Sequence, residues 1–338
     1  MPNHHPQIAT FACRPSDIPT QITAGSQHLI LEDPRVSIRT FQKMPLDDTP
    51  LLELIQTAKK HTSSLSFNLD IIAHHADFEL IEHIIRLLRD QKIHHIRIQD
   101  YGLAPLIRDI NPKAEISLFT ETSSTNYDAI KTLSTLFEAQ QLSNEIPFSE
   151  LIIITSKIQK KFDLLVQGPL LIQYSPRRFM QNQPTPITDD PIIAKAVDDQ
   201  YPNRTFTFLD NPHGHFMYLY FHRCLVRYYN ELCQLNLRYW IIDTRGLDAD
   251  TTQHYIQAYT QHPIQNPNEE LQNLAKISGI SQRPGFFRAN KTDQERTSIS
   301  SQETSHSIGT IIDIIKHQSL TIQTTSSLQV GEELKIIT

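Results

Sequence analysis

Short apolar runs alternate with longer amphipathic segments along most of this sequence, and this alternation restricts the fold more than any other feature. Eight runs have the length of buried strands and are bounded by polar residues or proline: 7–12, 28–31, 65–69, 95–99, 115–119, 151–155, 163–167 and 238–243. Such runs are typical of parallel strands that are covered on both faces. Segments with apolar residues at helical spacing separate most of them: 51–61, 77–91, 104–110, 125–140, 221–235 and 251–262.

Eight alternating strand and helix units predict an α/β protein with a (β/α)8 barrel, a TIM-like fold. A doubly wound open sheet is the alternative. That fold normally has a glycine-rich first turn, and the segment CRPSD (13–17) has no glycine. Ser16, Asp77 and Asp250 stand where helix N-caps are expected.

Two segments interrupt the alternation and divide the chain. Residues 168–220 are rich in Pro, Asn and Asp, and we interpret them as a long insertion, a functional loop or a lid. Residues 263–305 are rich in Gln, Asn, Ser and Thr and read as a connector. Residues 306–338 alternate apolar and polar residues around turns, which predicts a small C-terminal β-barrel. The (β/α)8 barrel is therefore expected over residues 1–262.

The composition fits a soluble protein in the cytoplasm. The net charge of −6 argues against non-specific nucleic-acid binding by the whole surface, although a local basic patch is compatible with it. The three cysteines, Cys13, Cys224 and Cys233, form no CxxC pair, and an odd number indicates a reducing compartment. We find no signal peptide and no apolar segment long enough to span a membrane.

Functional residues of a (β/α)8 barrel gather at the carboxyl ends of its strands. Carboxylates and one histidine at those positions are candidates for acid–base catalysis: Asp70, His74, Asp100, Glu121 and Asp243. Polar and basic residues there are candidates for substrate binding: Gln167, Tyr174, Arg177, Arg178 and Arg245. Asp243 and Arg245 can equally pair with each other, and Asp100 can equally cap the helix that follows it.

The histidines do not predict a metal site. His74 and His75 follow the third strand, whereas His94 and His95 precede the fourth, so the two pairs should lie at opposite ends of the barrel. His213 and His215 lack a third ligand. Ser175 has no nearby histidine in the sequence, so no catalytic triad can be assigned.

The order of several motifs resembles the collagenase-like peptidase family U32. The matching segments are Ile72-Ala73-His74, Gln99-Asp100-Tyr101-Gly102, Phe119-Thr120-Glu121, Thr125-Asn126, the run from Gln167 to Arg178, Cys224-Leu225, Glu231-Leu232, Ile242 to Arg245, and Ala258-Tyr259. The C-terminal segment resembles a small β-barrel that some members carry. The resemblance covers almost the whole chain and implies a barrel protein.

The resemblance also implies an iron–sulfur cluster on four cysteines and a link to hydroxylation of tRNA, rRNA or a ubiquinone precursor. Of the four cysteines only Cys224 has a counterpart here, and Arg178 stands at the position of another. Pro15 replaces a family glycine, and Gln167 replaces a family histidine. We therefore predict no iron–sulfur cluster and no other cofactor.

Three functions follow from this interpretation. The first is a role in RNA hydroxylation as a cluster-free accessory, with RNA or a paralogous family member as partner; the basic residues Arg177, Arg178, Arg283 and Arg288 favour it. The second is a collagenase-like peptidase, as the family name suggests. The third is a non-enzymatic binding or assembly protein on a barrel that has lost its chemistry.

Overall fold

The structure is a computed structural model that describes residues 7–120, 123–180, 190–197, 199, 204–260, 266–288, 309–315, 319–324 and 327–329. The chain divides into two compact units, residues 1–290 and 291–338. The first unit contains a closed barrel, and the described strands of the second form a hairpin.

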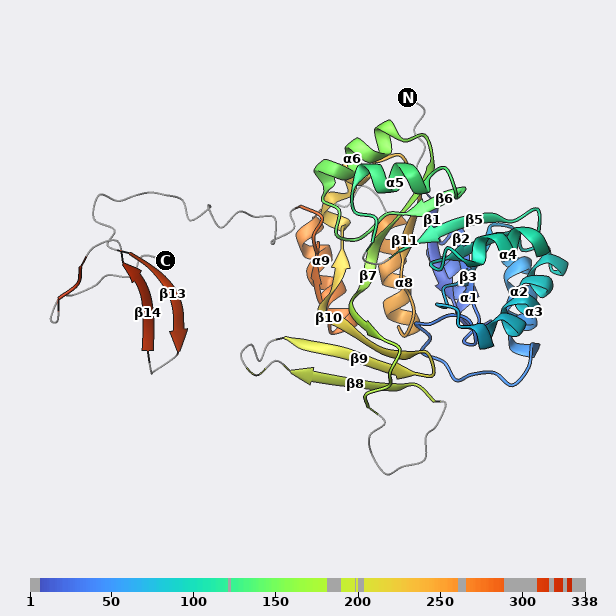
Figure 1. Cartoon of the computed structure of the whole chain (residues 1–338), viewed down its shortest axis with the longest axis horizontal. Coiled ribbons are helices and arrows are strands. Elements are labelled where there is room, and N and C mark those ends of the chain that lie inside the picture. The colour runs from blue at the N-terminus through green and yellow to red at the C-terminus, as the bar shows by residue number, and fades with distance from the viewer. Residues whose placement is uncertain are drawn as a thin grey trace. The chain divides into compact units, whose positions relative to one another are not determined.

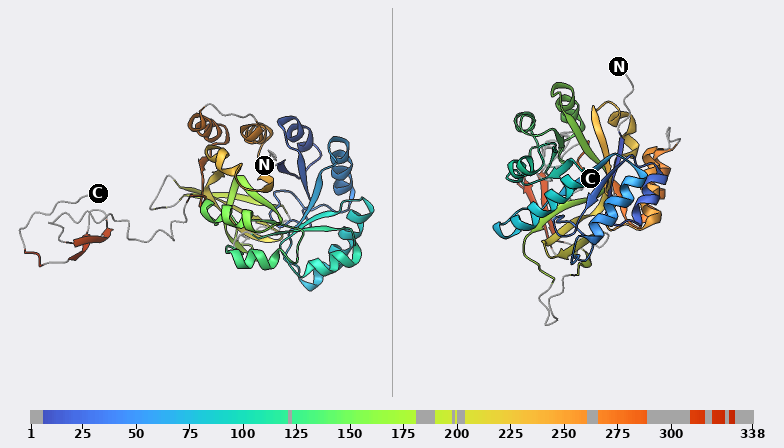
Figure 2. Two further views of the ribbon diagram at one scale, coloured as in Figure 1. Left: turned by 90° about the horizontal axis from the view of Figure 1, so that it is seen from above. Right: turned by 90° about the vertical axis from the view of Figure 1, so that its right-hand side faces the viewer.

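Eight parallel strands form the barrel, which confirms the predicted (β/α)8 fold (Figures 1 and 2). They are β1 (Gln7–Ala12), β2 (His28–Glu32), β3 (Leu65–Leu69), β4 (His95–Ile98), β5 (Glu115–Phe119), β6 (Ala139–Gln141), β7 (Lys161–Ser175) and β11 (Leu237–Ile242). Each strand pairs with the next in this order, and β11 pairs with both β7 and β1, which closes the ring.

Helices surround the barrel strands (Figure 2). They are α1 (Asp17–Ala24), α2 (Thr49–His61), α3 (Phe78–Asp90), α4 (Leu103–Ile110), α5 (Tyr127–Leu133), α6 (Phe148–Lys157), α7 (Tyr229–Leu232), α8 (Ala249–Thr260) and α9 (Pro267–Ser278), with 3-10 turns η1 (His75–Asp77) and η2 (Val226–Tyr228). In α3 the buried residues Ile81, Ile84, Ile85 and Leu88 recur every three or four positions, so one face packs on the barrel.

The predicted caps are only partly realised. Ser16 stands at the N-cap of α1 but its side chain makes no capping hydrogen bond. The Asp77 carboxylate accepts the backbone N–H of His74 at 2.7 Å and so closes η1 instead of capping α3 directly. Asp248, not Asp250, accepts the Thr251 N–H at the start of α8, at 2.7 Å.

The predicted strand at 151–155 is wrong, because these residues lie in helix α6. Leu151, Ile154 and Thr155 are buried while Ile153 is exposed, which is a helical pattern that the aliphatic run conceals. The sixth strand is β6, and it begins within the last two residues of the segment 125–140 that we expected to be one helix and ends at Gln141. The predicted helix at 221–235 is also wrong at its start, since residues 221–224 belong to a strand.

The segment 168–220, expected as a long loop, instead extends the sheet in its described part. Strand β7 continues beyond the barrel and pairs antiparallel with β10 (Gly214–Cys224); β9 (Thr205–Asn211) and β8 (Ile192–Val197) follow. Strand β12 (Ser281–Arg283) pairs with the other edge of β10. Figure 1 shows this extension beyond the carboxyl ends of the barrel strands.

In the second unit, β13 (Gly309–Ile315) and β14 (Ser319–Thr324) pair antiparallel. The remaining residues of 306–338 lie largely outside the described part of the chain, so the small β-barrel stays a prediction. The domain limits at 262 and 305 are likewise predictions. Among the described residues, no helix is both long enough and apolar enough to cross a membrane.

Candidate functional site

Polar residues line the interior of the barrel at positions that alternate with apolar ones. Arg97 lies between Ile96 and Ile98, and all three are buried. Because side chains of a strand alternate between its faces, the two isoleucines reach the helix layer while Arg97 points into the barrel. Glu32, Asn68, Gln141 and Asp163 are also buried on their strands.

Asp243, Arg245 and Glu32 form a buried network at the carboxyl end of the barrel. The Arg245 guanidinium donates to both Asp243 oxygens, at 2.8 and 2.6 Å, and to Glu32 Oε1 at 3.1 Å. It also lies 4.0 Å from the centroid of the Phe11 ring. Burial opposes ionisation of Asp243, but the charge and hydrogen bonds of Arg245, together with the charge of Arg39, outweigh burial and lower the pKa of this carboxyl. Asp243 and Arg245 therefore pair with each other, the alternative that the sequence left open.

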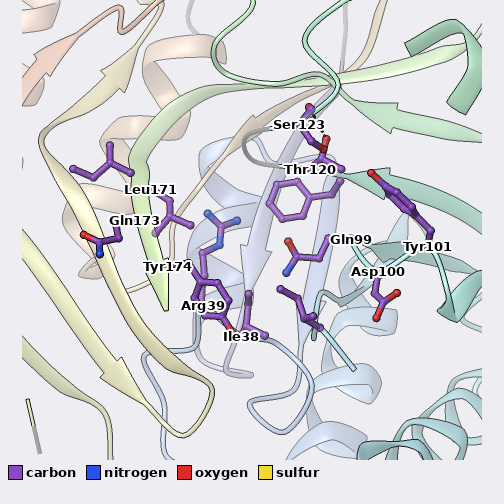
Figure 3. A pocket seen from close by; sticks show the side chains of 13 residues that line it. Ile38, Arg39, Gln99, Asp100, Tyr101, Thr120, Ser123, Leu171, Gln173 and Tyr174 are labelled. Atoms are coloured by element: carbon purple, nitrogen blue, oxygen red, sulfur yellow. Dashed lines mark hydrogen bonds between the residues drawn. The ribbon is translucent and has the colours of Figure 1, made fainter. Parts of the chain in front are cut away.

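A cavity of about 710 Å³ opens at the same end of the barrel (Figure 3). Its lining comes from the loops after β2, β3, β4 and β5 and from the outer part of β7: Ile38, Arg39, Ile72, Gln99, Asp100, Tyr101, Phe119, Thr120, Ser123, Leu171, Ile172, Gln173 and Tyr174. The Arg39 guanidinium lies 5.1 Å from the Phe119 centroid. The cavity thus combines aromatic and aliphatic walls with a cation and an amide.

The Gln99 carboxamide is held in one orientation. Its Nε2 donates to the main-chain oxygen of Asp70, so this hydrogen bond fixes the direction of the amide nitrogen. Figure 3 shows Gln99 and Arg39 on facing sides of the cavity. The site therefore offers an amide and a guanidinium to one ligand.

Several buried polar atoms beside the cavity lack a hydrogen-bond partner among the described residues. Asp70 Oδ1 accepts the Ile38 N–H at 2.8 Å, but Oδ2 has no partner. Arg97 Nη2 donates to Gln141, whereas Nε and Nη1 have none, and Asn68 Oδ1 has none. Arg97 lies 5.3 Å from the centroid of Phe119, a lining residue. An unsatisfied buried polar group costs about 1–3 kcal/mol, so a group of them is typical of a binding site.

Burial affects the charges next to the cavity. It lowers the pKa of Arg97 to about 10, against the opposing charge of Asp163. Burial, and then the Asp70 charge, raises the pKa of Tyr174. Arg97 therefore remains a cation at neutral pH and Tyr174 a neutral phenol, which can donate and accept hydrogen bonds. Its hydroxyl donates to the main-chain oxygen of His213 at 3.1 Å.

The predicted catalytic residues do not all meet at the cavity. Asp100 lines it, but its carboxylate accepts the N–H groups of Ala73 at 3.1 Å and Gly102 at 2.9 Å, so it stabilises two turns. His74 is exposed, and Glu121 lies outside the described residues. Asp70 lies buried beside the cavity, and Asp243 belongs to the paired network.

The predicted substrate-binding residues are also dispersed. Tyr174 lines the cavity. Gln167 is fully buried, and its Nε2 donates to Gln282 Oε1 at 2.8 Å, so a neighbouring side chain uses this amide. Arg177 is exposed and Arg178 is half-buried on the loop after β7. Arg245 is occupied by Asp243 and Glu32.

Sequence reasoning missed Arg39, Arg97 and Asn68, and it named Phe119 only as part of a family motif, without a role. A signal existed for Arg97 and Asn68, because each interrupts an otherwise apolar strand, and a polar residue there faces the barrel interior. Arg39 lies in the irregular loop after β2, and no pattern in the sequence marks it. Gln99 belongs to one of the motifs that resemble the family but was given no role.

The cysteines do not fit the cluster ligation that the resemblance implies. Cys13 donates to Glu32 Oε2 at 3.3 Å, Cys224 lies 4.0 Å from the Tyr259 hydroxyl, and Cys233 is exposed. Burial raises the pKa of Cys224 to about 11, which opposes the thiolate that a metal requires. Within the described ranges, no three His, Cys, Asp or Glu side chains are placed to hold a metal ion.

His213 and His215 have other partners. His213 Nε2 lies 2.7 Å from the main-chain oxygen of Pro34. His215 pairs with the buried carboxylate of Asp210, which also accepts the N–H of Met180 at 2.7 Å. These two histidines therefore hold loops against the barrel mouth.

The known proteins that this chain is similar to include the following three. The tRNA hydroxylation protein P1 of Bacillus subtilis (strain 168) is 23% identical over 136 residues, which are 40% of this chain and 32% of that protein. The solved structure of a U32 peptidase is 11% identical, with a TM-score of 0.41 over 48% of this chain and 69% of that one. The tryptophan synthase α2β2 complex of Pyrococcus furiosus is 7% identical, with a TM-score of 0.41 over 81% of this chain and 98% of that one.

The match to the first of these relatives thus spans about a third of that protein's length. The model of Peptidase family U32 matches residues 17–297, which include seven of the eight barrel strands, β2 to β7 and β11, the extended sheet and the cavity described above. This match covers well over half of the chain, and the chain belongs to peptidase family U32.

Proposed function

We propose that this protein serves the hydroxylation of tRNA or rRNA by holding an RNA base in the mouth cavity. The observation that carries the proposal is the lining of the cavity, which combines the Tyr101 ring, the Arg39 guanidinium and the Gln99 amide; buried atoms of Arg97, Asp70 and Asn68 without a partner among the described residues lie in the barrel interior. The edge of a nucleobase carries donors and acceptors side by side, and its faces stack on aromatic rings and guanidinium groups. Tyr101 offers an exposed ring, and Arg39, stacked on Phe119, offers a guanidinium group on the lining.

In this proposal the chain is a cluster-free accessory, and the oxidation takes place on a partner, such as a paralogous family member with a complete cysteine set. The separate positions of Cys13, Cys224 and Cys233 support this division. The resemblance to a protein named for tRNA hydroxylation is consistent with it. A cytoplasmic location, where tRNA and ribosomes are found, belongs to the same proposal.

Peptidase activity, which the family name implies, receives less support from the site. A serine or cysteine peptidase needs a nucleophile beside a base. The described lining residues include neither cysteine nor histidine, and the Thr120 hydroxyl donates to the main-chain oxygen of Ser123 at 3.1 Å. Gelatin turnover by the pure protein would favour the peptidase.

The test compares hydroxylated pyrimidines in total RNA from cells with and without the gene, by mass spectrometry. We expect their loss on deletion, and recovery with the wild-type gene but not with Tyr101→Ala or Gln99→Leu. Phe78→Ala is the control, because Phe78 is an exposed aromatic residue that does not line the cavity. Unchanged RNA on deletion would contradict the proposal, and a stable partner complex would then favour a binding or assembly protein.

A further inference from the structure

Two groups of arginine and tyrosine side chains lie outside the cavity, one on the extended sheet and one formed by η2 and the residues after β12. Two guanidinium groups contact the Tyr220 ring of β10: that of Arg283 lies 5.0 Å from the ring centroid and that of Arg204 lies 5.3 Å from it. Arg283 also donates to the Tyr220 hydroxyl at 3.0 Å. Five residues further along the chain, Arg288 lies 4.6 Å from the Tyr228 centroid. We call Arg204, Tyr220, Tyr228, Arg283 and Arg288 the arginine–tyrosine surface.

The charge of this surface is only partly neutralised. Arg288 pairs with Glu231, but the Arg288 side chain is 52% exposed, so water screens this pair strongly. Arg283 is exposed and makes no ion pair with any residue in the described part of the chain. A protein with a net charge of −6 therefore presents cations on this part of its surface.

Tyr220 of this surface belongs to β10, the strand next to one that lines the cavity. Leu171 and Tyr174 of β7 line the cavity, and β10 pairs with this part of β7, with Tyr218 opposite Leu171. Adjacent strands lie about 5 Å apart, which is less than the length of one nucleotide step in an extended single strand. The neighbours of a base held in the cavity would therefore reach β10.

We propose that the arginine–tyrosine surface binds the single-stranded RNA that flanks the base in the cavity, a proposal that rests on the function proposed above. Single-stranded RNA is recognised by cations that follow its phosphates and by aromatic or guanidinium planes on which its bases stack. Tyr220 and Tyr228, each beside an arginine, offer both contacts. An acidic peptide would use the arginine charges but not the stacked planes, so the observations favour RNA.

The test measures the affinity of the full-length protein for a fluorescent single-stranded RNA over a range of salt concentrations. We expect the double variant Arg204→Ala/Arg283→Ala to bind about tenfold more weakly. The slope of log K against log salt should fall by about 0.7 for each phosphate that the variant no longer neutralises. Arg283→Lys keeps the charge but not the planar group, so its affinity for RNA should lie between that of the wild type and that of the double variant. Arg86→Ala is the matched control, an exposed, ion-paired arginine on α3.

The outcomes separate this inference from the function on which it rests. If the wild type binds RNA and the double variant binds equally well with the same slope, the arginine–tyrosine surface is overturned and the cavity proposal stands. If the wild type binds no RNA, both fail. If poly-glutamate displaces the RNA as well as unlabelled RNA does, the surface recognises an acidic protein and the RNA assignment is wrong. An unchanged urea midpoint of the double variant shows that weaker binding is not a folding defect.

Discussion

At the scale of single residues, one buried arginine pairs with two buried carboxylates. Arg245 lowers the pKa of Asp243 against the effect of burial, whereas burial keeps the pKa of Glu32 raised despite its contact with Arg245. Removing one partner of a buried ion pair leaves an uncompensated charge, which is far more costly than the pair is stabilising. The arginine is therefore a structural requirement of the mouth, whatever else binds there.

We predict that Arg245→Met lowers the free energy of unfolding by about 3–5 kcal/mol, because two carboxylates lose their common cation. Urea denaturation measures the loss. Arg86→Met is the control; its pair with Glu82 is exposed, so it should change stability by no more than about 1 kcal/mol. Equal losses in the two variants would show that the buried network does not hold the mouth together.

A second residue-scale prediction concerns pH. Burial lowers the pKa of His222 to about 4, against the opposing charge of Asp243, while an unfolded histidine titrates near 6.5. The unfolded chain therefore binds the proton first. The neutral, buried His222 therefore contributes fully to the free energy of unfolding above pH 6.5. This contribution is lost as the pH falls towards 4, by roughly 3 kcal/mol in total. His28 and His95, with lowered pKa values, act in the same direction.

Urea titrations between pH 7 and pH 4.5 measure this loss. His222→Gln should flatten the dependence, since an amide does not titrate and can still accept the Tyr255 hydroxyl, now 2.9 Å from Nδ1. His74→Gln, at an exposed position, should leave it unchanged. An identical slope in His222→Gln and the wild type would contradict a buried neutral histidine.

At the scale of elements, the β9–β10 hairpin depends on a glycine. Gly214 has φ +135°, and a Cβ built there would lie 2.1 Å from the Ser175 main-chain oxygen on β7. We predict that Gly214→Ala destabilises the protein by more than Gly279→Ala, where φ is +66° but nothing lies within 4 Å of the added carbon. The second substitution should cost only the backbone strain, about 1 kcal/mol. The urea midpoints of the two variants test this prediction. A smaller loss of stability in Gly214→Ala than in Gly279→Ala would mean that the pairing of β7 and β10 adjusts to the added carbon at little cost.

The elements that could be predicted from the sequence are those with a clear period. Helix α3 places its apolar residues at helical spacing, six of the eight barrel strands were found near their observed limits, and β7 was found but extends eight residues beyond its predicted end at 167. Strand β6 was missed because it is short and polar, AQQ, and is a strand only through pairing with β5 and β7. The run 151–155 was misassigned because an unbroken aliphatic segment shows neither the helical period of about 3.6 residues nor the strand period of 2. The secondary structure of these elements depends on pairing with residues far away in the sequence, which a local hydrophobic pattern does not reveal.

The candidate site was less predictable than the fold for a related reason. Their positions at strand ends correctly placed Asp70, Asp100, Tyr174 and Asp243 near the mouth. The sequence did not indicate which of these side chains already have hydrogen-bond or ion-pair partners within the protein. Asp243 is used by Arg245, and Asp100 by two main-chain N–H groups, whereas Asp70 keeps one oxygen unpaired. That distinction depends on residues far away in the sequence, such as Ile38 for Asp70.

At the scale of the whole molecule, the barrel does not end where its last strand and helix end. Helix α9 and strand β12 belong to the first compact unit, and their segment adds Leu274 and Phe287 to the core, both fully buried. Gln282 of β12 binds Gln167 and Tyr255. The segment that looked like a connector thus completes the barrel wall in its described part.

We therefore predict that a chain ending at Asn290 unfolds at the same urea midpoint as the full-length protein, whereas a chain ending at His262 is severely destabilised. Losing a large buried apolar side chain costs about 2–5 kcal/mol, and the shorter chain lacks both Leu274 and Phe287. The two truncations control for each other, since both remove the second unit and only one removes α9 and β12. If the chain ending at His262 were as stable as the longer one, the barrel would be complete without this segment, as the sequence alone suggested.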